Sequence, residues 1–130
     1  MIPMTNDKFG CKTCWPDQAN DAWSNFKSLN LTKELVDESH FKIKVHACPQ
    51  CQQAFVSVFS ERIDWIDGED PQDRQIMPLT PQEQQAVIGA ENEDVVYQLS
   101  QQRKVLQWEF PKGSDSIARW AVGLQRVPHD

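Results

Sequence analysis

The stretch at residues 41–51, FKIKVHACPQC, contains the strongest structural signal in the chain. From Phe41 to His46 the residues alternate between apolar and polar, which is the period of a half-buried β-strand. This strand runs directly into two cysteines separated by two residues. Residues 54–59, AFVSVF, follow and predict a second strand that reaches Trp65. Their imperfect alternation is compatible with a bulge or with burial on both faces.

A second cysteine pair with the same spacing lies near the N-terminus, at Cys11-Lys12-Thr13-Cys14. Two intervening residues let a tight turn place both sulfurs on one ion, and zinc is held tetrahedrally by four such ligands. The 33 residues between Cys14 and Cys48 form a longer loop than usual. That length adds only about 0.6 kcal/mol of closure cost, against about 10–16 kcal/mol for zinc binding in finger peptides. We therefore predict one Zn²⁺ per chain, bound by Cys11, Cys14, Cys48 and Cys51. Iron fits the same ligand set.

Around Cys48 the sequence resembles the zinc-ribbon class, in which one strand enters a C-P-x-C turn and another leaves it. The resemblance covers about residues 41–59 and the first cysteine pair, and it implies ligation by all four thiolates. Zinc-ribbon turns often carry glycine directly after the second cysteine, where this chain has Trp15 and Gln52. The chain otherwise resembles a small bacterial zinc-binding protein. Ribbons serve in transcription, translation and enzymes alike, so the resemblance implies a scaffold more than a function.

The rest of the chain predicts short helices and a hairpin. Apolar residues from Ala19 to Leu29 recur at helical spacing, and a turn or short helix is expected at residues 32–38. Thr80-Pro81-Gln82-Glu83 predicts a helix start. That helix should end near Gly89, and another is expected within residues 91–102. Apolar and polar residues alternate at 106–110 and again at 118–124, which predicts a hairpin of two strands.

These elements predict one α+β domain over residues 1–130. Its ribbon-like part, a hairpin with an inserted helix, spans residues 9–66. The short helices and the C-terminal hairpin occupy residues 67–130.

Charge and segment composition limit the possible partners. The formal net charge is −6, and no segment carries the cluster of lysines and arginines that nucleic-acid binding requires. We therefore expect no nucleic-acid partner. The N-terminus lacks the features of a secretory signal, and no apolar run approaches the length of about 20 residues that spans a bilayer. We expect no membrane association and a cytoplasmic, reducing location, where paired cysteines bind metals more often than they form disulfides.

The acidic stretch Asp64-Trp65-Ile66-Asp67-Gly68-Glu69-Asp70 is the other unusual segment. Its spacing does not match a calcium-binding loop. A solvated acidic turn, with Trp65 packed in the core, is the simplest interpretation. The alternative is a partner contact, in which Trp65 acts as an anchor beside Asp64, Asp67, Glu69 and Asp70.

No catalytic constellation is found in the sequence, and we expect no enzyme activity. His46 could donate to a cysteine sulfur or replace a ligand, but a surface position is the simpler interpretation. Four cysteines leave zinc no open position for a water. We interpret the chain as a structural-zinc protein that binds an unknown protein partner. The alternative is a thiol-redox or metal-handling protein that uses its two cysteine pairs.

Overall fold

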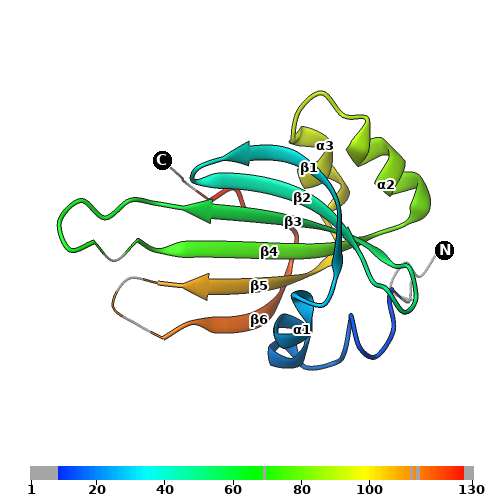
Figure 1. Cartoon of the computed structure of the whole chain (residues 1–130), viewed down its shortest axis with the longest axis horizontal. Helices are drawn as coiled ribbons and strands as arrows, with labels where there is room; N and C mark the ends of the chain where they lie inside the picture. The colour runs from blue at the N-terminus through cyan, green and yellow to red at the C-terminus, as the bar shows by residue number, and fades with distance from the viewer. Residues whose placement is uncertain (1–8, 69, 112, 114, 128–130) are drawn as a thin grey trace.

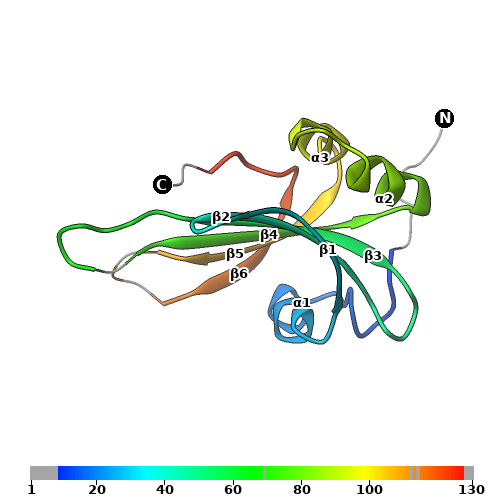
Figure 2. The ribbon, with the colours of Figure 1, turned by 45° about the horizontal axis from the view of Figure 1, so that its top comes forward.

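The computed structural model describes residues 9–68, 70–111, 113 and 115–127. One antiparallel sheet of six strands is formed in the order β1-β2-β3-β4-β5-β6, so that strands adjacent in sequence are adjacent in space (Figure 1). Helix α1 lies on one face of this sheet, and α2 and α3 lie on the opposite face (Figure 2). The expected α+β class is confirmed. The elements are α1 (Ala19–Phe26), β1 (Asn30–Glu38), β2 (Phe41–Ala47), β3 (Ala54–Glu61), β4 (Gln72–Leu79), α2 (Pro81–Ile88), α3 (Asp94–Leu99), β5 (Lys104–Phe110) and β6 (Ile117–Val122).

The core is divided between the two faces of the sheet. Neighbouring residues of β3, Phe55 and Val56, are both fully buried because one points toward α1 and the other toward α2 and α3. This burial on both faces explains the imperfect alternation of the strand. The cluster on the α2–α3 face consists of Phe41, Ile43, Val45, Ala54, Val56, Val58, Met77, Leu79, Val87, Val96 and Val105. The cluster on the α1 face consists of Cys14, Ala22, Cys48, Phe55, Ile76 and Leu106.

Helix α2 begins at the expected capping box. The backbone N–H of Glu83 donates to Thr80 Oγ1 at 3.2 Å, and the backbone N–H of Thr80 donates to Glu83 Oε1 at 2.9 Å. Arg103 also donates to both oxygens of Glu83, at 2.6 and 2.9 Å, which ties the start of the helix to the chain just before β5. The helix reaches Ile88 and is followed by Gly89, as expected. Helix α3 is shorter than the range expected for it, residues 91–102.

Two strands differ from the sequence-based expectation. Residues 32–38, expected as a turn or short helix, belong to the edge strand β1, where register shifts between Leu31 and Lys33 and between Glu34 and Val36 break the two-residue period. The β4 strand was not expected at all, because its first half is polar. It nevertheless pairs with β3 from Ala54↔Leu79 to Glu61↔Gln72. The cysteine-bearing hairpin is therefore part of a larger sheet that extends across the boundary drawn at residue 66.

The segment between β3 and β4 forms an extended loop at one end of the sheet. Strand β3 ends at Glu61, so it does not reach Trp65. Trp65 is 84% exposed and its neighbour Ile66 is 88% exposed, which contradicts the interpretation of Trp65 as a core residue. The expected C-terminal hairpin is confirmed as β5 and β6. No helix in the described part of the chain is long and apolar enough to cross a membrane.

Candidate metal centre

The turn between β2 and β3 positions Cys48 and Cys51. It is closed by hydrogen bonds from the backbone N–H of Cys48 to Gln53 O and from that of Gln52 to Cys48 O, both at 2.9 Å. The backbone N–H of Gln50 points toward Cys48 Sγ at 3.4 Å. Gln52 has φ +68°, in the left-handed region that favours glycine. Of the two residues that stand where zinc-ribbon turns often carry glycine, Trp15 and Gln52, Gln52 adopts this conformation and Trp15 does not.

The first cysteine pair lies in a second tight turn. The backbone N–H of Cys11 donates to Cys14 Sγ at 3.2 Å, and that of Trp15 donates to Cys11 O at 2.9 Å. Gly10 enters this turn with φ +71°, and a Cβ at this position would lie 2.7 Å from Cys14 Sγ. Its backbone N–H donates to the side chain of Gln53 at 2.9 Å, which links the two cysteine turns. Glycine is the residue that allows the backbone at position 10 to adopt this φ and to lie this close to Cys14 Sγ.

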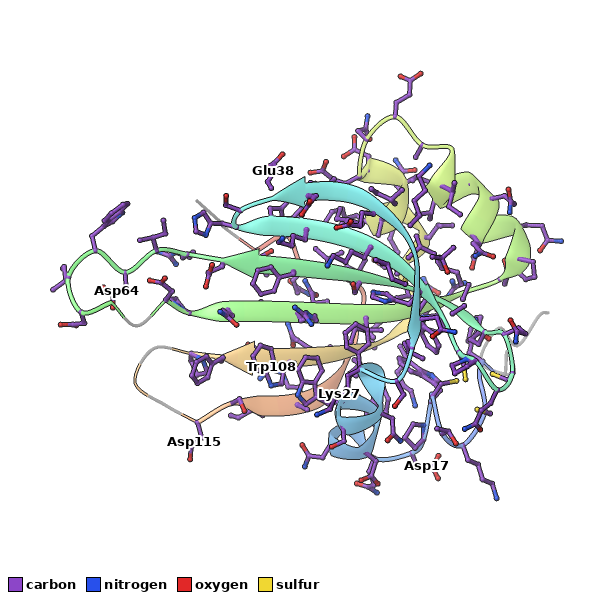
Figure 3. All side chains as sticks on the ribbon, viewed as in Figure 1. Asp17, Lys27, Glu38, Asp64, Trp108 and Asp115 are labelled. Carbon is purple, nitrogen blue, oxygen red and sulfur yellow. The ribbon has the colours of Figure 1, made fainter. Side chains whose placement is uncertain are left out.

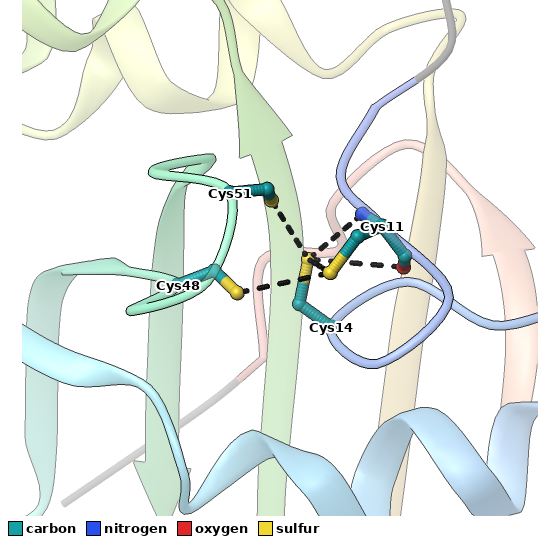
Figure 4. Close-up of side chains that lie close together, drawn as sticks. All are labelled: Cys11, Cys14, Cys48 and Cys51. Carbon is teal, nitrogen blue, oxygen red and sulfur yellow. Dashed lines mark hydrogen bonds between the residues drawn. The ribbon is translucent and has the colours of Figure 1, made fainter.

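The four sulfurs form one compact group (Figure 4). The Sγ–Sγ distances are 3.7 Å for Cys11–Cys14, 3.9 Å for Cys11–Cys48 and 3.7 Å for Cys14–Cys51. All four sulfurs lie within 4.8 Å of one another. A tetrahedral zinc with bonds of about 2.3 Å to sulfur requires sulfur separations of about 3.8 Å, whereas a disulfide bond is about 2.05 Å long. The cysteines are free thiols arranged to hold a metal ion, and their geometry is compatible with Zn²⁺.

The thiols differ in exposure and in acidity. Cys14 and Cys48 are buried, Cys11 is half-buried and Cys51 is exposed. Hydrogen bonding from the backbone of Cys14 lowers the pKa of the Cys11 thiol to about 6. Burial raises the pKa of Cys14 and that of Cys51. A cation at the centre of the group would stabilise all four thiolates, so metal binding removes the cost of burying them.

Aromatic rings cover the metal centre on the side of the sheet. The Trp15 ring packs 5.4 Å from Phe55 and 4.9 Å from Trp120, measured between centroids. Lys104 Nζ lies 4.1 Å from the centroid of Trp120, and the indole N–H of Trp120 donates to Asp17 O at 2.7 Å. These contacts attach the first cysteine turn to β3, β5 and β6.

His46 is neither a surface residue nor part of the sulfur group. It is 8% exposed, and its Nε2 forms a 2.8 Å hydrogen bond with Ser57 Oγ on β3. The ring also packs edge-on against Phe26 of α1, with centroids 4.9 Å apart. Burial, with the charges of Arg74 and Lys44, lowers the pKa of His46 to about 4. The surface interpretation made from the sequence was wrong because α1 covers this part of the sheet.

The acidic segment lies at the opposite end of the sheet from the cysteines (Figure 3). Asp64 Oδ1 accepts hydrogen bonds from the backbone N–H groups of Ile66 and Asp67, at 3.1 and 3.2 Å. Asp70 Oδ1 accepts one from the backbone N–H of Asp64 at 2.7 Å. The loop is thus folded by its own carboxylates, with Trp65 at its tip. Glu69 lies outside the described residues.

A cluster of aromatic rings around Arg74 is absent from the sequence-based prediction. Stacked rings follow one another as Phe26–Trp23, Trp23–Trp108 and Trp108–Phe110, with centroids 5.7, 4.7 and 6.1 Å apart. Helical spacing in α1 and alternation in β5 indicated which rings share a face. Arg74 was missed because its strand, β4, was not recognised.

The chain was compared with protein-family models, curated proteins and solved structures. The chain matches no protein-family model, no curated protein and no solved structure.

Proposed function

We propose that this chain is a structural-zinc protein that binds a protein partner through its β3–β4 loop, residues 62–71. The separation of the four cysteine sulfurs, close to that of a tetrahedral zinc site, supports the metal assignment. The exposure of Trp65 and Ile66 at the tip of this loop supports the assignment of the contact surface.

The zinc has a structural role in this proposal. Four thiolates fill a tetrahedral coordination sphere, so no position is left for a substrate or a reactive water. The metal instead joins the N-terminal turn at Cys11 and Cys14 to the β2–β3 turn at Cys48 and Cys51. That link holds α1 against the sheet, because α1 follows the first cysteine turn directly.

The β3–β4 loop has the composition of a binding hot spot. Two large apolar side chains, Trp65 and Ile66, are almost fully exposed and are flanked by Asp64, Asp67 and Asp70. Aromatic anchors with a polar rim recur at the centre of protein interfaces. Hydrogen bonds from the backbone to Asp64 and Asp70 already order the loop, which reduces the entropy lost on binding.

Two measurements on one purified sample test this function. Elemental analysis of protein purified without added metal should give one zinc per chain. Affinity capture from the native cell extract should recover a specific partner, and the double variant Trp65→Ala/Asp67→Asn should lose it while its zinc content and melting temperature stay unchanged. Leu31→Ala, which shortens a 53% exposed side chain on β1, is the matched control. Equal capture by wild type and the double variant would refute the loop as the contact. A zinc ratio near zero would refute the metal assignment.

The thiol-redox or metal-handling alternative is favoured by two properties of single cysteines. The Cys11 thiol has a pKa lowered to about 6, and Cys51 is exposed, so both could react if the metal were absent. Counting alkylated thiols in native protein separates the two functions. Slow alkylation at full zinc occupancy favours the structural role. Metal-free protein with cysteines that readily oxidise favours the alternative.

A further inference from the structure

The sheet extends beyond α1 and leaves part of the α1 face uncovered. In Figure 2 this helix lies below one half of the sheet, and no helix is drawn below the other half. We use the name open face for the part of this surface that begins at the edge of α1, and we define it by Phe59, Arg74, Trp108 and Phe110. Arg74 and Trp108 lie at that edge, where both contact Trp23 of α1. Phe110 is 44% exposed, and the other three residues are half-buried. The open face is therefore a largely aromatic surface that contains one cation, Arg74, beside the ring of Phe59.

Arg74 is the distinctive residue of the open face. Its guanidinium carbon lies 5.0 Å from the ring centroid of Phe59, 5.6 Å from that of Phe26 and 5.9 Å from that of Trp23. Among the described residues, no carboxylate lies within ion-pair distance of Arg74. Cation–π contacts offset part of the cost of burying the charge. They leave the planar N–H groups without the carboxylate that a guanidinium binds best.

The chain itself carries a segment complementary to this surface. The β3–β4 loop combines exposed Trp65 and Ile66 with the carboxylates of Asp64, Asp67 and Asp70. The loop also lies at the same end of the sheet as the open face. Phe59 is close to the end of β3 and Arg74 is close to the start of β4, and the loop connects these two strand ends (Figure 1). The high exposure of Trp65 shows that the tip does not fold back onto the face of its own chain.

We propose that a second copy of this chain covers the open face, with the β3–β4 loop of each copy lying across Phe59, Arg74, Trp108 and Phe110 of the other. Two complementary surfaces on one chain allow such a reciprocal pair with two-fold symmetry. The exposed ends of two sheets overlap face to face, and α1 of each copy limits how far the overlap extends. This inference rests on the proposed function for its assignment of the loop as the contact surface, and it names the partner.

Sedimentation tests the association. We expect the zinc-loaded wild type to shift from monomer to dimer between about 1 and 200 µM, a range that brackets micromolar dissociation constants. Trp65→Ala should weaken the dimer by about 30-fold or more, as expected for a hot-spot residue. Arg74→Met keeps an apolar side chain among the rings but removes the charge, and it should also weaken the dimer. Leu31→Ala, far from both surfaces, should leave the dissociation constant unchanged.

Photocrosslinking then tests the geometry. A photoreactive phenylalanine analogue is placed at position 65, and unlabelled and ¹⁵N-labelled chains are mixed. Mixed-isotope crosslinks from position 65 to peptides containing Phe59, Arg74 or Trp108 would support the proposal. A chain that is monomeric throughout the concentration range would overturn it. A dimer that tolerates both substitutions, or that crosslinks through the exposed edge of β6, would also overturn it. A monomer whose loop still captures a different protein would overturn this inference but leave the proposed function intact.

Discussion

Replacement of Cys48 by serine removes one buried ligand of the candidate metal centre. The Cys48 sulfur lies 3.9 Å from that of Cys11, so the two thiols share the site that joins the β2–β3 turn to the N-terminal turn. Three remaining thiolates hold zinc less tightly, and zinc binding is linked to folding. We therefore expect Cys48→Ser to lose zinc and to be much less stable than wild type.

The size of the effect follows from the loop that the metal closes. Between Cys14 and Cys48 lie 33 residues, and a cross-link around a loop of that length restricts the unfolded chain by about 4 kcal/mol, using the relation derived for disulfides. An unfolding entropy of about 2.1 cal/mol/K per residue converts 1 kcal/mol into about 4 °C for a chain of 130 residues. The melting temperature should therefore fall by about 15 °C.

Thermal unfolding measured by circular dichroism, with zinc content determined on the same samples, checks this prediction. Gln50→Ala is the control, because Gln50 is an exposed non-ligand in the same turn whose side chain accepts a 3.2 Å hydrogen bond from Thr13 Oγ1. The control should retain zinc and melt close to wild type. If Cys48→Ser lost its zinc but melted within a few degrees of wild type, the metal would not stabilise the fold.

Three further predictions address the glycine turn, a half-buried carboxylate and nucleic acids. Gly10→Ala should reduce zinc affinity, because the new Cβ would meet Cys14 Sγ; Gly113→Ala, at a similar φ of +74° but in open space, should not, and competition with a colorimetric chelator measures both. Burial, with the nearby charge of Glu109, raises the pKa of Asp73 to about 6. The unfolded chain therefore loses this proton at a lower pH than the native state does. The free energy of unfolding should then decrease as the pH rises from about 4 to about 6. Asp73→Asn should accordingly stabilise the protein by about 1–2 kcal/mol at pH 7 and by nothing at pH 3.5 in chemical denaturation. Gel shifts at about 150 mM salt should show no general DNA or RNA binding, because the net charge is −6; micromolar binding would contradict that argument.

The sequence predicts most accurately those elements whose signals are local. The capping box at Thr80 and Glu83 marks the start of α2 because both hydrogen bonds form within four consecutive residues. The cysteine spacing indicates the ligand set for the same reason, since each pair is one turn. Alternation identifies β2 because one of its faces is buried more deeply than the other.

Features that depend on tertiary position are not predictable in this way. β1 lies at the edge of the sheet with most of its residues exposed, so no apolar pattern marks it. The first half of β4 is polar, so its sequence does not indicate a strand in the interior of the sheet. The position of Arg74 among three aromatic rings could therefore not be predicted either. The burial of His46 depends on α1, which reaches it from a distant part of the sequence.

The order of strands in the sheet has a consequence for how the protein folds. Because every strand pairs with its neighbour in sequence, the sheet can grow by successive pairings of adjacent strands, of which only the β4–β5 pairing has helices, α2 and α3, in its connection. The β2–β3 hairpin would then present Cys48 and Cys51 as a two-thiolate site before the distant N-terminal turn arrives. Docking of that turn completes the coordination sphere and brings α1 onto the sheet. On this order, the binding of zinc as proposed would be a late step of folding, and a chain without zinc would keep its sheet while α1 detaches from it.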